Sequence, residues 1–180
     1  MKECLLLYIY KDNREFNIDI LKEVYEESVV FFTDRILVLD LSKIEWDNIF
    51  PAVKDFNSGQ FMVTHSRSIH LLRFFIRNKY KILEISFYKH AEKTQKLIDE
   101  ILEFINSDDV NLRIKGKFLE LLKEEFDYEE NENDNYVKSI KVKLESSYVE
   151  FYDCTRIRID DSISQCDIDV IKTLLDSISD

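Results

Sequence analysis

The sequence predicts an α/β fold: a mostly parallel four-to-five-stranded sheet with helices, followed by a C-terminal antiparallel hairpin and a helix. Three observations lead to this prediction. Apolar runs alternate with amphipathic segments through the first half of the chain, which is typical of crossover connections between parallel strands. Residues Ile36–Leu39, which run into Asp40-Leu41-Ser42, are apolar on both faces, as a central strand requires. Beyond residue 136, apolar and polar residues alternate with a period of two, which predicts a hairpin.

The expected strands of the parallel sheet are apolar, β-branched and aromatic runs bounded by turn residues. In chain order they are Cys4–Tyr10, Val29–Phe32, Ile36–Leu41, Gln60–Thr64 and Tyr80–Tyr88. The second and third runs are separated by Thr33-Asp34-Arg35, which fits a tight turn, although one continuous strand is equally compatible. Gly59 precedes the fourth run and fits a helix stop.

The expected helices have apolar residues three and four positions apart. In chain order they are Ile18–Glu27, a short helix after Ser42 or one that begins at Pro51, a helix capped by Ser66 or Ser68 that runs through Asn78, Ala91–Ile105, Val110–Phe126 and Asp167–Ile178. Ser42 and Glu45 have the Ser-x-x-Glu spacing of a capping box, and Pro51 fits a helix only near its start. Gly116 predicts a break in its helix.

The segment 127–135 contains five acidic residues and no basic one, which predicts a flexible loop. The expected organisation is an α/β core over residues 1–126 that ends in two extra helices, an acidic loop over 127–136, and a hairpin–helix appendage over 137–180 packed on the same domain. In the hairpin, a turn at Ser146-Ser147 would pair Leu144 with Val149 on the buried face and Lys143 with Glu150 on the solvent face. Asp153 would then face inwards, which predicts a bulge or a strand end there.

The composition argues against several classes of function. The net charge is −11, from 25 basic and 36 acidic residues, so general nucleic-acid binding is not expected, because phosphate neutralisation drives that binding. Neither of the two glycines belongs to a phosphate-binding loop, and no apolar run is long enough to span a membrane. Cys4, Cys154 and Cys166 are scattered and odd in number, which favours a reduced, cytoplasmic protein.

The basic residues gather around one turn and the helix after it. Residues 65–96 contain eight Lys or Arg and two acidic residues. The turn lies between a strand and a helix, where backbone N–H groups and the helix dipole attract anions. A spacing of four, three and four places Ser66, His70, Arg73 and Arg77 on one helical face. The candidate anion-binding or partner-binding residues are Ser66, Arg67, Ser68, His70, Arg73 and Arg77. A solvated face of a half-buried helix is the alternative interpretation.

No catalytic or metal-binding set is recognisable. The histidines have no serine, cysteine or aspartate partner at a recognisable spacing, so a structural role is expected for His65, His70 and His90. Helix capping and solvation account for the acidic residues near the last helix, Asp160, Asp161, Asp167 and Asp169. We therefore predict no catalytic residue, no metal and no cofactor.

One stretch of sequence follows a known pattern. An apolar strand ends in Leu39-Asp40-Leu41-Ser42-Lys43-Ile44, and Asp47, Gly59, Phe61–Thr64 and His70–Arg77 follow in order. Over residues 4–88 this pattern resembles a STAS domain, the module of sulfate transporters and anti-sigma factor antagonists. The resemblance implies a non-enzymatic binding module. The family has a phosphorylatable Ser or Thr after the aspartate, whereas Asn48 follows Asp47 here, so the resemblance does not carry over the phosphorylation switch.

These observations predict a non-enzymatic, cytoplasmic regulatory or protein-interaction module that binds an acidic partner or an anion at the His65–Arg77 turn and helix. Two alternatives stay open: an enzyme that acts on a phosphorylated substrate at the same turn, and an acidic inhibitor that occupies a basic site on its target. We expect a protein partner and no membrane association, and a homo-oligomer is a further open alternative.

Overall fold

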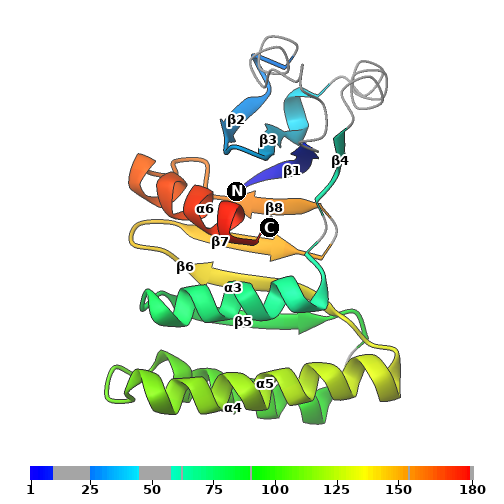
Figure 1. Cartoon of the computed structure of the whole chain (residues 1–180), viewed down its shortest axis with the longest axis vertical. Helices are drawn as coiled ribbons and strands as arrows, with labels where there is room; N and C mark the ends of the chain where they lie inside the picture. The colour runs from blue at the N-terminus through cyan, green and yellow to red at the C-terminus, as the bar shows by residue number, and fades with distance from the viewer. Residues whose placement is uncertain (10–24, 45–57, 62, 90, 154, 179–180) are drawn as a thin grey trace. The chain divides into compact units, whose positions relative to one another are not determined.

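The computed structural model describes residues 1–9, 25–44, 58–61, 63–89, 91–153 and 155–178. The chain divides into two compact units, one formed by residues 1–62 and 154–180 and the other by residues 63–153. Figure 1 shows the elements of both. Most of the expected helix Ile18–Glu27, the helix expected near Pro51, Asp47 of the STAS-like pattern and His90 lie outside the described residues.

The first unit contains a sheet with β1 at its centre. Its elements are β1 (Lys2–Ile9), β2 (Val29–Phe32), β3 (Ile36–Asp40), the 3-10 helix η1 (Leu41–Lys43), β4 (Ser58–Gln60), β8 (Arg156–Ile159) and α6 (Gln165–Ile178). β3 pairs with one edge of β1, and β2 pairs with the far edge of β3. The other edge of β1 pairs with β8 along its first half and with β4 along its second half.

The second unit combines a three-stranded sheet with three helices. Its elements are α3 (His65–Arg77), β5 (Lys81–Phe87), α4 (Glu92–Asn106), α5 (Leu112–Asn133), β6 (Val137–Lys143) and β7 (Tyr148–Tyr152). The strand order is β5-β6-β7. α3 contacts β5, β6 and α5, while α4 contacts β5 and α5 (Figure 1). Phe75, Phe126 and Phe151 are almost fully buried in this unit.

The prediction of a mostly parallel sheet is wrong, because every strand pair found among the described residues is antiparallel. β2 and β3 form a hairpin whose turn is held by Thr33, which accepts a hydrogen bond from the backbone N of Ile36 at 3.0 Å. β5 pairs with β6 in the second unit and does not return to β1. All five residues of β3 are buried between β1 and β2. The apolar run therefore predicted a central strand correctly, but it carried no information on strand direction.

The segment predicted as an acidic loop is mostly helical. α5 runs through Gly116 without a break and ends at Asn133, where Asp134 adopts a left-handed backbone with φ of 47°. The helix continues because the buried positions Leu119, Leu122, Phe126 and Glu129 keep helical spacing into the acidic segment. Acidic composition alone suggested a loop, although the helical periodicity was unbroken.

The C-terminal hairpin is confirmed, but its register is shifted by two residues from the predicted one. Val149 pairs with Val142 rather than with Leu144, and Lys141 rather than Lys143 lies opposite Glu150. The cause is a longer loop, closed by a hydrogen bond from Leu144 N to Ser147 O of 2.9 Å. A shift of two residues keeps every side chain on its face, so Leu144 and Val149 are both buried as predicted. β7 ends at Tyr152, which confirms the strand end expected near Asp153.

Candidate functional site

The six residues proposed from the sequence all lie on α3, but they do not form one exposed face. Thr64 is the N-cap, so the helix begins one residue before Ser66. Ser66, His70 and Arg77 are exposed, and Arg73 is partly buried. Ser68 is only 3% exposed and packs inwards, while Arg67 takes part in an interaction within the described chain. The basic stripe that reaches solvent is therefore reduced to His70, Arg73 and Arg77, of which Arg73 is only partly exposed.

His65 closes the first turn of α3 against α5. Its Nδ1 lies 3.2 Å from Oε2 of Glu130, and its Nε2 lies 3.0 Å from Oδ1 of Asp127, although the latter contact is not aligned as a hydrogen bond. The ring also meets Phe126 edge-on at 6.0 Å. Two carboxylates beside the first turn oppose an incoming anion. This arrangement disfavours a phosphate site at Ser66–Ser68.

A second candidate surface lies between α4 and α5, within the second unit. It is a groove of about 200 Å³, and a cavity of that order accepts one benzene-sized group. Its lining residues are Leu97, Glu100, Ile101 and Phe104 of α4 and Phe118, Leu121, Glu124 and Glu125 of α5. We call this surface the α4–α5 groove.

The α4–α5 groove exposes large apolar side chains to solvent. Phe104 is 52% exposed, Leu121 45% and Leu97 40%. The rings of Phe104 and Phe118 stack across the two helices with centroids 5.0 Å apart and planes 7° apart. Contiguous exposed apolar surface of this kind is typical of protein interaction sites.

Three glutamates flank this apolar floor, with Glu100 on one helix and Glu124 and Glu125 on the other. Within the described part of the chain, none of the three side chains makes a hydrogen bond or an ion pair. The groove therefore combines an apolar floor with negative charges that no cation of the described chain neutralises.

The sequence contained a signal for this groove. Leu97, Ile101 and Phe104 follow the spacing i, i+4, i+7 on α4, beside the buried series that contains Ile98 and Ile105. An apolar stripe wider than one packing face indicates a helix with two partners. The sequence predicted the helix Ala91–Ile105 but not its second apolar face.

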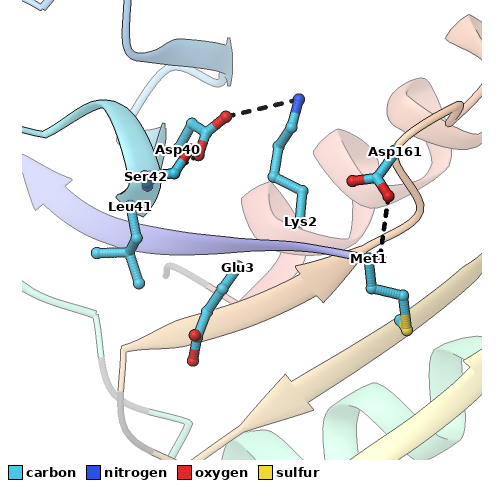
Figure 2. Close-up of a pocket in the computed structure, with 7 residues that line it drawn as sticks. All are labelled: Met1, Lys2, Glu3, Asp40, Leu41, Ser42 and Asp161. Atoms are coloured by element: carbon cyan, nitrogen blue, oxygen red, sulfur yellow. Dashed lines mark hydrogen bonds and ion pairs between the residues drawn. The ribbon is translucent and has the colours of Figure 1, made fainter.

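A larger hollow of about 450 Å³ lies in the first unit, beside the N-terminal end of β1 (Figure 2). Its charged groups are paired internally. The Met1 amino group lies 3.0 Å from Asp161 Oδ2, and Lys2 Nζ lies 3.7 Å from Asp40 Oδ2 (Figure 2). Glu3 pairs with Arg156 at 3.3 Å. Among the described residues that line this hollow, every charged group is therefore paired, which leaves none of them to select a ligand.

Asp40, the acidic residue of the STAS-like pattern, has a structural role in this hollow. It caps η1, because its Oδ1 accepts hydrogen bonds from the Ser42 backbone N at 3.0 Å and from the Ser42 hydroxyl at 2.7 Å. Burial alone would raise the pKa of Asp40, but these hydrogen bonds together with Lys2 and Lys43 outweigh it and lower the pKa below its ordinary value.

No family model, curated protein or solved structure matches this chain, so the resemblance of residues 4–88 to STAS domains stays a prediction. Among the described residues, no three His, Cys, Asp or Glu side chains gather in a way that could hold a metal ion. None of the helices that the structure describes has both the length and the apolar character needed to cross a membrane.

Proposed function

We propose that this protein is a non-enzymatic, cytoplasmic interaction module that binds another protein through the α4–α5 groove. The observation that carries the proposal is the exposure of Leu97, Phe104 and Leu121 around one hollow. Burying such side chains in an interface stabilises a complex by roughly 25 cal/mol per Å² of apolar surface, before the costs of association. Neither Cys4 nor Cys166 forms a disulfide within the described residues, which suits a reducing compartment.

The test is capture of partners from a native lysate with identification by mass spectrometry. The variant Leu97→Gln/Leu121→Gln removes apolar surface and keeps good helix formers. Leu83→Gln is the matched control, since Leu83 is 43% exposed, lies on β5 and does not line the groove. We expect the same partner with the wild type and the control, and at least a tenfold loss with the double variant, about 1.4 kcal/mol. Equal capture by the double variant would contradict the proposal.

The stripe formed by His70, Arg73 and Arg77 supports a second proposal, the acidic partner expected from the sequence. Within the described residues, none of the three side chains makes an ion pair or a hydrogen bond. If the stripe binds an acidic segment, Arg73→Gln/Arg77→Gln should weaken binding of a polyglutamate peptide, and added salt should weaken it in the wild type. Binding of this peptide that is unchanged by the double substitution would exclude the stripe as its site.

A further inference from the structure

The groove also specifies the kind of segment that fits it. Its apolar floor runs along two helices, with Leu97, Ile101 and Phe104 at helical spacing on one and Phe118 and Leu121 on the other. Rows of side chains at these spacings form ridges, and a third helix laid along the groove can insert one apolar side chain into the hollow and pack the rest of its apolar ridge against the exposed side chains beside it. Recognition of a helix in a groove uses apolar anchors at i, i+3, i+4 and i+7.

The charges beside the apolar floor determine which residues are favoured on either side of the apolar face of such a helix. Glu100 lies on one wall, while Glu124 and Glu125 lie on the other, and all three lack a partner within the described residues. A basic residue on either side of the bound apolar face would meet a carboxylate. Complementary charges at the rim of an interface contribute mainly specificity and association rate.

On the basis of the proposed function, we infer that the occupant of the α4–α5 groove is an amphipathic helix of a partner protein, with Lys or Arg residues flanking its apolar face. A second copy of this chain fits less well. A two-fold pairing of the groove with itself brings Glu100, Glu124 and Glu125 of one copy towards the same residues of the other, and like charges repel. The experiment must therefore distinguish self-association from binding of a partner's helix.

The probe is a set of three fluorescently labelled peptides as long as α4, which has 15 residues. Each peptide carries leucines at i, i+3, i+4 and i+7, and the residues that flank this face are lysine, glutamine or glutamate. Binding to the full-length chain is measured by fluorescence anisotropy at low and high salt. The protein variants are Glu100→Gln/Glu124→Gln/Glu125→Gln, Leu97→Gln/Leu121→Gln and the control Leu83→Gln, and circular dichroism confirms that each one folds.

We expect the lysine peptide to bind the wild type about tenfold more tightly than the glutamine peptide, with the glutamate peptide weakest. High salt and the triple glutamine variant should remove this preference. The Leu97→Gln/Leu121→Gln variant should bind none of the peptides, and Leu83→Gln should behave as the wild type.

Equal binding of the lysine and glutamine peptides, or no binding of any peptide, would overturn the inference. Light scattering that shows a dimer, with loss of that dimer in Leu97→Gln/Leu121→Gln, would overturn it in favour of a second copy. The proposed function has a separate test, which is whether the Leu97→Gln/Leu121→Gln variant loses its cellular partner. It can therefore fail independently of the peptide experiment. If the partner is lost but the peptides are not distinguished, the groove is a docking site for a segment of different chemistry.

Discussion

The side chain of Asn106 hydrogen-bonds both backbone groups of Ile82, as a neighbouring strand would. Its Oδ1 accepts from Ile82 N at 3.0 Å, and its Nδ2 donates to Ile82 O at 2.7 Å. Gln95 Nε2 also donates to the carbonyl of Ile85 at 3.1 Å. Ile82 and Ile85 belong to β5, whose other edge pairs with β6. Polar side chains of α4 therefore cover an edge that could otherwise pair with another chain.

Replacing Asn106 should destabilise the second unit and expose this edge. We expect Asn106→Ala to lower the free energy of unfolding by about 1–3 kcal/mol, because both backbone groups of Ile82 lose their partner. Urea denaturation measures this change, and light scattering detects any self-association through β5. Asn78→Ala is the control, since Asn78 is exposed and makes one side-chain hydrogen bond, to Phe74 O. Equal destabilisation by the two substitutions would contradict a special role for Asn106.

The sequence predicted the position of most elements but not their pairing. Apolar runs identify buried strands such as β3, because burial on both faces favours apolar residues, here Ile36–Leu39. Direction depends on which strands meet, and a single run carries no signal for that. The hairpin register was wrong by two residues for a related reason: a two-residue shift keeps Leu144 and Val149 on the buried face, so the alternation of apolar residues cannot exclude it.

The sequence placed the candidate site on a helix, but it could not show which residues are used internally. Ser68 and Arg73 lie on the same helix as exposed neighbours, yet Ser68 is buried and Arg73 is partly buried. His65 faces Asp127 and Glu130 from α5, more than sixty residues further along the chain. Contacts of this kind depend on tertiary packing, and local spacing does not encode them.

Glu129 is a buried carboxylate that links three segments of the second unit. It is 2% exposed, and its oxygens accept hydrogen bonds from Thr94 Oγ1 at 2.6 Å and from Asn135 Nδ2 at 2.7 Å. Asn135 in turn accepts from the backbone N of Lys89 at 2.8 Å. α4, the end of α5 and the segment after β5 are therefore connected through the side chains of Glu129 and Asn135.

We expect Glu129→Ala to lower the free energy of unfolding by about 2–4 kcal/mol, because it leaves the Thr94 hydroxyl buried without this acceptor and Asn135 Nδ2 with only the Lys89 carbonyl. Glu129→Gln should cost less, since its amide oxygen still accepts from one of the two. Urea denaturation monitored by circular dichroism compares the variants. Glu132→Ala is the control on the same helix, because Glu132 is exposed. A cost for Glu129→Ala no larger than that of Glu132→Ala would show that the network contributes little.

The reactivity of the cysteines should differ strongly. Burial raises the pKa of Cys4 to about 12. The negative charges of Asp40 and Glu3 act in the same direction, and the positive charge of Lys2 opposes them. The thiolate is the reactive form, so buried Cys4 should resist alkylation at neutral pH, whereas exposed Cys166 should react. Iodoacetamide labelling of the folded protein, read peptide by peptide by mass spectrometry, measures each site separately. Labelling of Cys4 at the rate of Cys166 would contradict the prediction, and labelling in urea gives the unfolded reference.

The lowered pKa of Asp40 predicts how acid affects the first unit. The folded-state pKa lies below the ordinary value because the Ser42 hydrogen bonds, Lys2 and Lys43 outweigh the effect of burial. The unfolded chain has a pKa of about 3.9 for this group. The ionised carboxylate therefore stabilises the fold fully above that unfolded-state pKa, and the stabilisation is lost as the pH falls through the lower folded-state pKa.

Asp40→Asn keeps an acceptor for Ser42 but cannot ionise. We expect the difference in free energy of unfolding between wild type and Asp40→Asn to be constant near neutral pH and to shrink as the pH falls below about 4. Urea denaturation at a series of pH values measures it. Asp161→Asn is the control, because Asp161 is 73% exposed and its pair with the Met1 amino group is screened by solvent. A difference that stays constant or grows on acidification would show that Asp40 is not stabilised as the anion.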